Sequence, residues 1–150
     1  MKKRTKARSI ALQILYEVDV SGHKPGLVMA ERFERLKMGD DLKRFISQIV
    51  SGVIQYKGIL DEFISDFAPE WPLDQVASID RNLLRIALWE IAVYQKTPVK
   101  VVINEAVELA KLYGSEGSPR FINGVLGGFI DNLEEIKLSM EIVQDEDDED

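Results

Sequence analysis

The chain has 150 residues, 45% of them hydrophobic, which is enough for one domain with a substantial core. It contains no cysteine, so disulfides, thiolate metal sites and a cysteine nucleophile are excluded. The net charge of −7 is unevenly distributed, because five of the first eight residues are basic and the last six are all acidic. A basic arm and an acidic tail on a mildly acidic body are typical of interaction termini.

The first predicted helix runs from about Thr5 to Ser21, with a stripe of apolar residues at helical spacing. Arg4 and Arg8 fall close to the line of that stripe. They cannot be buried there unpaired, so we expect the first turns to project beyond the end of the bundle. Cations at a helix N-terminus oppose the helix dipole, and phosphate binding explains them better than the alternative of an ordinary solvated terminus. The basic residues concerned are Lys2, Lys3, Arg4, Lys6 and Arg8.

Two further helices are predicted before residue 68. A short one follows the turn at 23–26 and ends near Leu36, and a strongly periodic one begins at residue 40. Gly58 is a candidate break in the second, after which the apolar face continues to Phe67. His23 is a lone loop histidine, and we expect no catalytic role for it.

Pro69 and Pro72 mark the best internal boundary. We therefore expect one helical half over residues 4–67, a linker over 68–73 and a second half over 74–138. The helix that follows the linker, from Asp74 or Ser78 to Gln95, is apolar almost all round. Such a helix is typically central and would pack against both halves.

Two helices meet within the stretch from Pro98 to Gly128. Pro98 predicts the start of the first, and Gly114 is expected to end it in the left-handed conformation. Ser118-Pro119 repeats the start signal for the second. That second helix contains three glycines, which predict close approach of another helix, with a ligand or partner chain as the alternative. They are Gly124, Gly127 and Gly128.

Arg120 and Phe121 lie in the first turn of this second helix, beside free backbone N–H groups. An anion is favoured at such a position, and a flat ring there can stack on a nucleic-acid base. Packing of Phe121 in the core is an equal alternative. Tyr16, in the first helix, supplies another aromatic ring near the basic residues.

These segments give an all-α protein of about seven helices. The last helix is expected to end near Leu138, and the acidic tail 139–150 is expected to be disordered on composition. We find no glycine-rich phosphate loop, no metal-ligand spacing and no carboxylate marked as desolvated, so we predict no enzyme, no catalytic residue, no metal and no cofactor. No apolar run reaches the length of a membrane span, so we predict a cytoplasmic protein.

Three segments carry a resemblance to the NusB family of bacterial transcription antitermination factors: Ala11–Asp19 (ALQILYEVD), Ile79–Ile91 (IDRNLLRIALWEI) and Lys100–Leu126 (KVVINEAVELAKLYGSEGSPRFINGVL). The resemblance implies an all-helical RNA-binding fold of two helical halves without known catalysis. It also implies binding of the boxA element of nascent ribosomal RNA transcripts, jointly with the ribosomal protein NusE. In the transcription elongation complex this binding would make the polymerase resist termination.

The resemblance also implies roles for individual residues. The family's arginine-rich arm falls on Arg4, Lys6 and Arg8, beside Lys3. Its RNA-facing tyrosine matches Tyr16, and its basic–aromatic pair matches Arg120 and Phe121. The NusE-facing surface would include Asp80, Glu116 and Ser118, although Gly117 stands where family members can have an acidic residue.

Two rival interpretations remain. One is an RNA-binding module of the kind fused to ribosomal RNA methyltransferases, but the chain stops before any cofactor domain. The other is a protein adaptor that binds no RNA. A monomer and a homodimer are both open.

Overall fold

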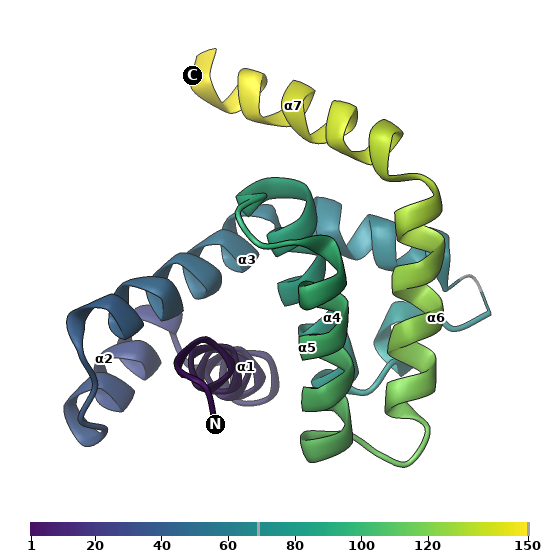
Figure 1. Ribbon diagram of the computed structural model, residues 1–150. Helices are drawn as coiled ribbons and strands as arrows, with labels where there is room; N and C mark the ends of the chain where they lie inside the picture. The colour runs from purple at the N-terminus through teal and green to yellow at the C-terminus, as the bar shows by residue number, and fades with distance from the viewer. Residues whose placement is uncertain (69, 150) are drawn as a thin grey trace.

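The computed structural model describes the backbone of residues 1–68 and 70–149, and the side chains up to residue 146. Within these residues the prediction of an all-α protein is confirmed (Figure 1). The elements are α1 (Lys3–Ser21), α2 (Pro25–Arg35), α3 (Asp40–Phe67), the 3-10 turn η1 (Leu73–Gln75), α4 (Ser78–Trp89), the π-helical turn η2 (Glu90–Tyr94), α5 (Val99–Tyr113), α6 (Ser118–Asp131) and α7 (Leu133–Glu149).

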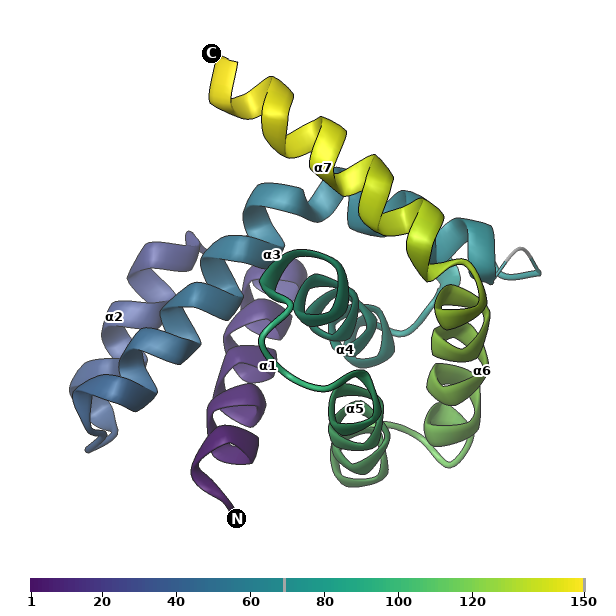
Figure 2. The same ribbon diagram turned by 45° about the horizontal axis from the view of Figure 1, so that its top comes forward.

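Helix α4 is the central element, as its nearly continuous apolar surface predicts. It packs against α1 and α3 on one side and against α5 and α6 on the other. Figures 1 and 2 show α2 and α7 at the periphery of this arrangement. The two predicted halves therefore share one hydrophobic core, which extends from Ala7 in α1 to Met140 in α7.

Helix α3 is continuous, so the predicted break at Gly58 is wrong. Gly58 is exposed within the helix, and apart from the adjoining backbone of α3 no described atom lies within 4 Å of the position that a Cβ would take. Gly52, in the same helix, has the opposite environment. A Cβ built there lies 2.1 Å from Nε1 of the Trp89 indole, so α3 and α4 pack closely only because residue 52 has no side chain.

The glycines of the C-terminal part differ from expectation. Apart from the adjoining backbone of α6, a Cβ at Gly124 or Gly127 meets no described atom within 4 Å. Among these three glycines the predicted close approach therefore occurs only at Gly128, where Phe67 lies 3.3 Å from the position of a Cβ. Gly114 is not left-handed, since its φ is −88°. Its lack of a side chain matters for another reason, because a Cβ there would lie 2.5 Å from the Ser118 hydroxyl.

The end of α7 corrects the prediction of a disordered tail. The helix continues to Glu149, well beyond the expected end at Leu138. Ile136 and Met140 are buried, with Met140 one turn after Ile136, and α7 packs on η2. These two side chains anchor the first half of α7 to the core. Pro69, from the predicted linker, and Asp150 lie outside the described residues.

No described helix combines the length and apolar character that crossing a bilayer requires.

Asp19 joins the end of α1 to the start of α4. Its carboxylate accepts hydrogen bonds from the Ser78 hydroxyl at 2.9 Å, from the Asn82 amide at 3.3 Å and from the Arg81 guanidinium. Burial raises the pKa of Asp19, but the hydrogen bonds from Arg81 and Ser78 and the charges of Arg81 and Arg85 outweigh burial and bring this pKa to about 2. The ionised carboxylate is therefore stabilised by folding.

Replacing Asp19 by asparagine is expected to lower the free energy of unfolding by about 1 to 2 kcal/mol at pH 7. The depressed pKa means that this stabilisation is present above the unfolded-state pKa near 3.8 and is lost as the pH falls through about 2. Urea unfolding followed by circular dichroism at pH 7 and pH 2.5 measures the difference. Asp66→Asn, at an exposed position, is the control, and an equal loss at both pH values for Asp19→Asn would contradict the charge argument.

Candidate nucleic-acid interface

The basic arm, which we define as Lys2, Lys3, Arg4 and Lys6, is exposed at the start of α1. The first turn of α1 contains no acidic residue, so its free N–H groups add to the positive charge of the arm. The expectation that the start of the helix is available to solvent is confirmed for these four side chains. An anion can reach them from solution.

Arg8 was predicted to contact RNA, and the structure contradicts this prediction. Its side chain is 4% exposed, and its Nε and Nη2 atoms each donate to one carboxylate oxygen of Glu90 at 2.8 Å. Burial lowers the pKa of Arg8, but the hydrogen bond and charge of Glu90 outweigh burial and raise it. Arg8 is thus buried and paired, contrary to the prediction that it projects from the bundle. It has no surface to offer a phosphate.

An aromatic platform holds Arg4 in place while leaving it exposed. The Arg4 guanidinium lies 4.1 Å from the centre of the Phe45 ring and donates a hydrogen bond of 3.3 Å to the Tyr94 hydroxyl. The Tyr94 ring in turn stacks on Trp89, with 5.1 Å between ring centroids. Thr5 adds a hydrogen bond of 2.9 Å to Glu105 of α5. The arm therefore has a defined position on the body of the protein.

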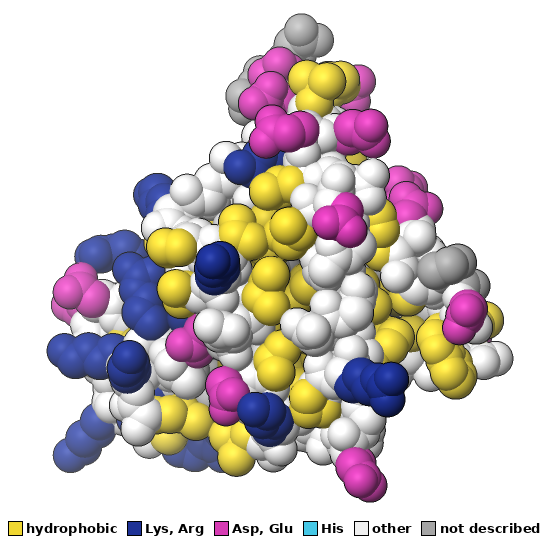
Figure 3. Space-filling view, turned by 45° about the vertical axis from the view of Figure 1, so that its right-hand side comes forward, with side chains coloured by type: hydrophobic (Ala, Val, Ile, Leu, Met, Phe, Trp, Pro, Cys, Tyr) yellow, Lys and Arg dark blue, Asp and Glu magenta, His cyan; other side chains and the backbone are white. Residues whose placement is uncertain are grey.

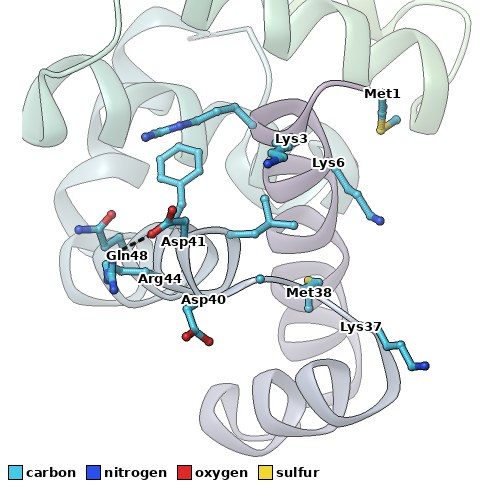
Figure 4. Close-up of a pocket in the computed structure, with 13 residues that line it drawn as sticks. Met1, Lys3, Lys6, Lys37, Met38, Asp40, Asp41, Arg44 and Gln48 are labelled. Atoms are coloured by element: carbon cyan, nitrogen blue, oxygen red, sulfur yellow. Dashed lines mark hydrogen bonds and ion pairs between the residues drawn. The ribbon is translucent and has the colours of Figure 1, made fainter.

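Two hollows lie on either side of the arm. The first, of about 800 Å³, separates the arm from the start of α3 (Figure 4). The second, of about 530 Å³, separates it from the connection between η2 and α5. Lys3 and Arg4 line both hollows. The fold brings three further cations to these hollows that the sequence reasoning missed: Lys37, Arg44 and Lys96.

Tyr16 is 40% exposed on α1. The hydrogen bonds of Gln13 and Asp19, on the same side of the helix, show which elements lie near it. Gln13, three residues earlier, donates to the Tyr113 hydroxyl at the end of α5. Asp19, three residues later, accepts from Ser78 at the start of α4. Residues three apart share a helix face, so Tyr16 lies on the side of α1 where α5 ends and α4 begins.

A separate cavity of about 470 Å³ lies at the start of α6 and contains Arg120 and Phe121. Asp80 lines the same cavity, so the structure brings together three predicted residues from two segments of the chain. Trp71, which is 54% exposed, lines it too and was missed by the sequence reasoning. Phe121 also packs partly on the core. The basic arm lines none of this cavity.

Of the residues predicted to face a protein partner, Glu116 alone is exposed. Ser118 is 1% exposed, and its hydroxyl accepts a hydrogen bond of 2.9 Å from the Ser115 N–H. The prediction that Ser118 contacts a protein partner is therefore wrong. Its side chain instead stabilises the connection between α5 and α6. Asp80 is 7% exposed, and its Oδ1 has no hydrogen-bond partner among the described residues. Burial raises its pKa, an effect that the neighbouring Ser118 hydroxyl opposes.

Charge is segregated on the surface. Figure 3 shows Lys and Arg side chains gathered mostly along one lower side of the molecule, and Asp and Glu side chains over the projecting end of α7. Within the described residues, no group of three or more His, Asp or Glu side chains could hold a metal ion. The exposed chemistry of the arm is that of a cationic binding surface.

Comparison with known proteins identifies the family of this chain. The model of the NusB family matches residues 5–131. The transcription antitermination protein NusB of Roseiflexus sp. (strain RS-1) is 45% identical over 134 residues, covering 88% of this chain and 94% of that protein. The protein of the same name from Dehalococcoides mccartyi (strain ATCC BAA-2266 / KCTC 15142 / 195) is 46% identical over 123 residues, covering 82% and 86%.

Solved structures show the same fold. T. maritima NusB superposes with a TM-score of 0.75 at 25% identity, covering 91% of each chain. A chain in the crystal structure of the antitermination factors NusB and NusE in complex with double-stranded RNA gives a TM-score of 0.78 at 25% identity, covering 93% of this chain and 98% of that one. The chain described here belongs to the NusB family.

Proposed function

We propose that this protein is an RNA-binding transcription antitermination factor that binds the boxA element of nascent ribosomal RNA together with NusE, within the transcription elongation complex. The observation that carries the proposal is the basic arm, whose cations are exposed while Arg4 and Thr5 are tied to the body of the protein. An ordinary solvated terminus has no need of such fixed cations. A preorganised cationic surface binds the phosphates of RNA with less loss of side-chain entropy.

The RNA path that we propose follows α1. Lys3, Arg4 and Lys6 contact phosphates at its start. Tyr16 offers an exposed ring farther along the same helix, on the side where α5 ends. The path then reaches Arg120 and Phe121 at the start of α6. Phosphate contacts supply affinity, and the aromatic rings supply stacking for unpaired bases.

Glu116 and the connection between α5 and α6 form the surface that we assign to NusE. Glu116 is exposed there, whereas Ser118 holds the connection in shape from beneath. Arg8 contributes indirectly, because its pairing with Glu90 fixes the helix that bears the arm. A known complex of NusB and NusE with double-stranded RNA supports both partners for a chain of this fold.

Replacing Lys6 by alanine, or Arg4 by glutamine, is expected to weaken RNA binding and to flatten its salt dependence. Each lost phosphate contact lowers the slope of log affinity against log salt concentration by about 0.7 for a single-stranded RNA. Fluorescence anisotropy of labelled boxA RNA over a range of salt concentrations measures the slope. Lys57→Ala is the matched control, since Lys57 is exposed on α3 and lines neither hollow beside the arm. Unchanged slopes in both arm variants would refute the proposed phosphate contacts.

A further inference from the structure

The second hollow beside the basic arm gathers cations that no described carboxylate neutralises. Lys96 lines this hollow together with Lys2, Lys3 and Arg4 of the arm. None of these four side chains forms an ion pair with a described residue. Like charges that are gathered without counter-charges repel one another, and an anion in the hollow relieves this repulsion.

The acidic residues of the two hollows decide which hollow suits an anion better. Glu105 is the one described carboxylate that lines the second hollow. Its Oε1 accepts a hydrogen bond of 2.9 Å from the Thr5 hydroxyl, and its Oε2 lies 3.8 Å from Nη1 of Arg8. The first hollow is lined by Asp40 and Asp41, which are both exposed (Figure 4). Two exposed carboxylates repel a phosphate, whereas the charge of Glu105 is already balanced.

The turn before Lys96 holds this residue at the edge of the second hollow. Lys96 Nζ lies 5.3 Å from the centre of the Tyr94 ring, and the hydroxyl of the same ring accepts the hydrogen bond of Arg4. Gln95 has a φ of 58°, in the left-handed region that residues with a side chain seldom adopt. Its N–H donates to the Glu90 carbonyl at 2.9 Å. One tyrosine therefore positions two cations beside the hollow.

The second hollow also lies in line with the proposed RNA path. Along the border between α1 and α5, Thr5 contacts Glu105 near the hollow, and Gln13 contacts Tyr113 at the other end of α5. Tyr16 is exposed beyond that other end. An RNA strand that runs along α1 from Tyr16 to the arm therefore reaches the second hollow next, whereas the first hollow lies on the side of α3.

We propose that the second hollow binds a phosphate of the RNA segment that flanks boxA, through Lys96 beside the arm. Tyr94 is the one described aromatic residue in its lining, and its ring is already stacked on Trp89 and lies beside Lys96. The hollow thus offers charge but no free ring for a base, and phosphate contacts carry no sequence information. The inference rests on the proposed RNA-binding function and extends it to RNA outside boxA.

The first test compares boxA RNA with boxA RNA that carries four extra nucleotides at its 5′ end or at its 3′ end. Each flank consists of uridine, adenosine or cytidine only. We expect a flank at one of the two ends to strengthen binding about fivefold at 0.1 M salt, equally for the three bases. One added phosphate contact steepens the salt slope by about 0.7, which corresponds to about fivefold in affinity between 1 M and 0.1 M salt.

Lys96→Gln is expected to remove the gain from the flank and to return the salt slope to that of boxA RNA alone. Lys100→Gln is the matched control, because it makes the same charge change at an exposed position of α5 that lines neither hollow. Fluorescence anisotropy of the labelled RNAs over a range of salt concentrations measures both quantities for the full chain.

Tyr94→Phe tests the positioning role of the tyrosine. This variant keeps the ring that stacks on Trp89 and removes only the hydroxyl that accepts from Arg4. We expect binding about twofold weaker, as for the loss of one hydrogen bond, with an unchanged salt slope because every cation is still present. In an Arg4→Gln background the same substitution should have no further effect. A further loss there would contradict positioning through Arg4.

Equal affinities of the wild-type protein for flanked and unflanked boxA RNA would overturn the inference, while flattened slopes in the Arg4→Gln and Lys6→Ala variants would leave the proposed function standing. A gain from the flank that survives in Lys96→Gln, that is also lost in Lys100→Gln, or that depends on the base would overturn it too. A lower slope of Lys96→Gln on unflanked RNA would place boxA itself in the hollow and overturn the assignment to the flank. Circular dichroism establishes that each variant is folded.

Discussion

Replacing Gly52 by alanine is expected to lower the free energy of unfolding by about 2 to 3 kcal/mol. The new methyl group would lie 2.1 Å from Nε1 and 2.3 Å from Cε2 of the Trp89 indole, far inside van der Waals contact. Neither partner can move freely, because Gly52 is buried within a continuous helix and the Trp89 ring stacks on Tyr94. The strain must therefore separate α3 from α4.

Gly58→Ala in the same helix is the control for the Gly52 prediction. Alanine has the higher helix propensity, and no described atom lies near the position of its Cβ, so this variant should be up to about 1 kcal/mol more stable than the wild type. Urea unfolding followed by circular dichroism compares the two. Adding Trp89→Phe to Gly52→Ala should restore part of the loss, because the ring becomes smaller. Similar stabilities for the two single alanine variants would show that α3 and α4 do not pack as described.

Removing Arg8 is expected to have a larger effect than Gly52→Ala. Arg8→Ala leaves the carboxylate of Glu90, which is 1% exposed, without its main partner, and breaking a buried ion pair in this way typically costs about 3 to 5 kcal/mol. If Arg8 were an exposed cation opposing the helix dipole, its removal would leave stability unchanged or slightly higher. Because Arg8 is buried and paired, its removal lowers the stability instead. The cost of leaving the Glu90 carboxylate buried without a partner far exceeds the dipole effect of an exposed cation.

A double variant separates charge from shape at this site. Arg8→Met combined with Glu90→Gln removes both charges while keeping side chains of similar size, and it should be markedly more stable than Arg8→Met alone. Urea unfolding of the wild type, both single variants and the double variant gives the coupling energy between the two residues. Arg4→Met is the exposed control and should change stability little. Additive effects of the two single substitutions would contradict the ion pair.

The helices could be predicted from sequence because their signals are local. The apolar period of α3, the start of α6 at Ser118-Pro119 and the apolar surface of α4 each depend on residues within one segment. Gly52 carried no such signal, since its significance depends on an indole from another helix. The π-helical turn η2 was also missed, because its extra residue per turn leaves no distinct pattern in the sequence.

The candidate site also has parts that local sequence predicts and parts that depend on tertiary packing. The basic arm was predictable from a run of charge. The burial of the next arginine, Arg8, was not, because it depends on Glu90, which lies 82 positions later. Asp80 and Phe121 were both selected from the sequence, yet their shared cavity depends on how α4 and α6 pack. Trp71 lies within the predicted linker and matched no motif. Residue type and local spacing identify such side chains, whereas tertiary packing decides which of them meet.

The contacts that fix the first helix come from much later in the chain, and this sets an order during synthesis. Arg8 pairs with Glu90, Thr5 with Glu105, and the Ser9 hydroxyl with that of Tyr113. The first helix is translated long before these partners. It therefore cannot bury Arg8 or orient its cations on the nascent chain until the segment through Tyr113 has left the ribosome. An incomplete polypeptide carries the positive charge of the arm without the geometry of the finished protein, so the ability to recognise RNA selectively arises late in translation.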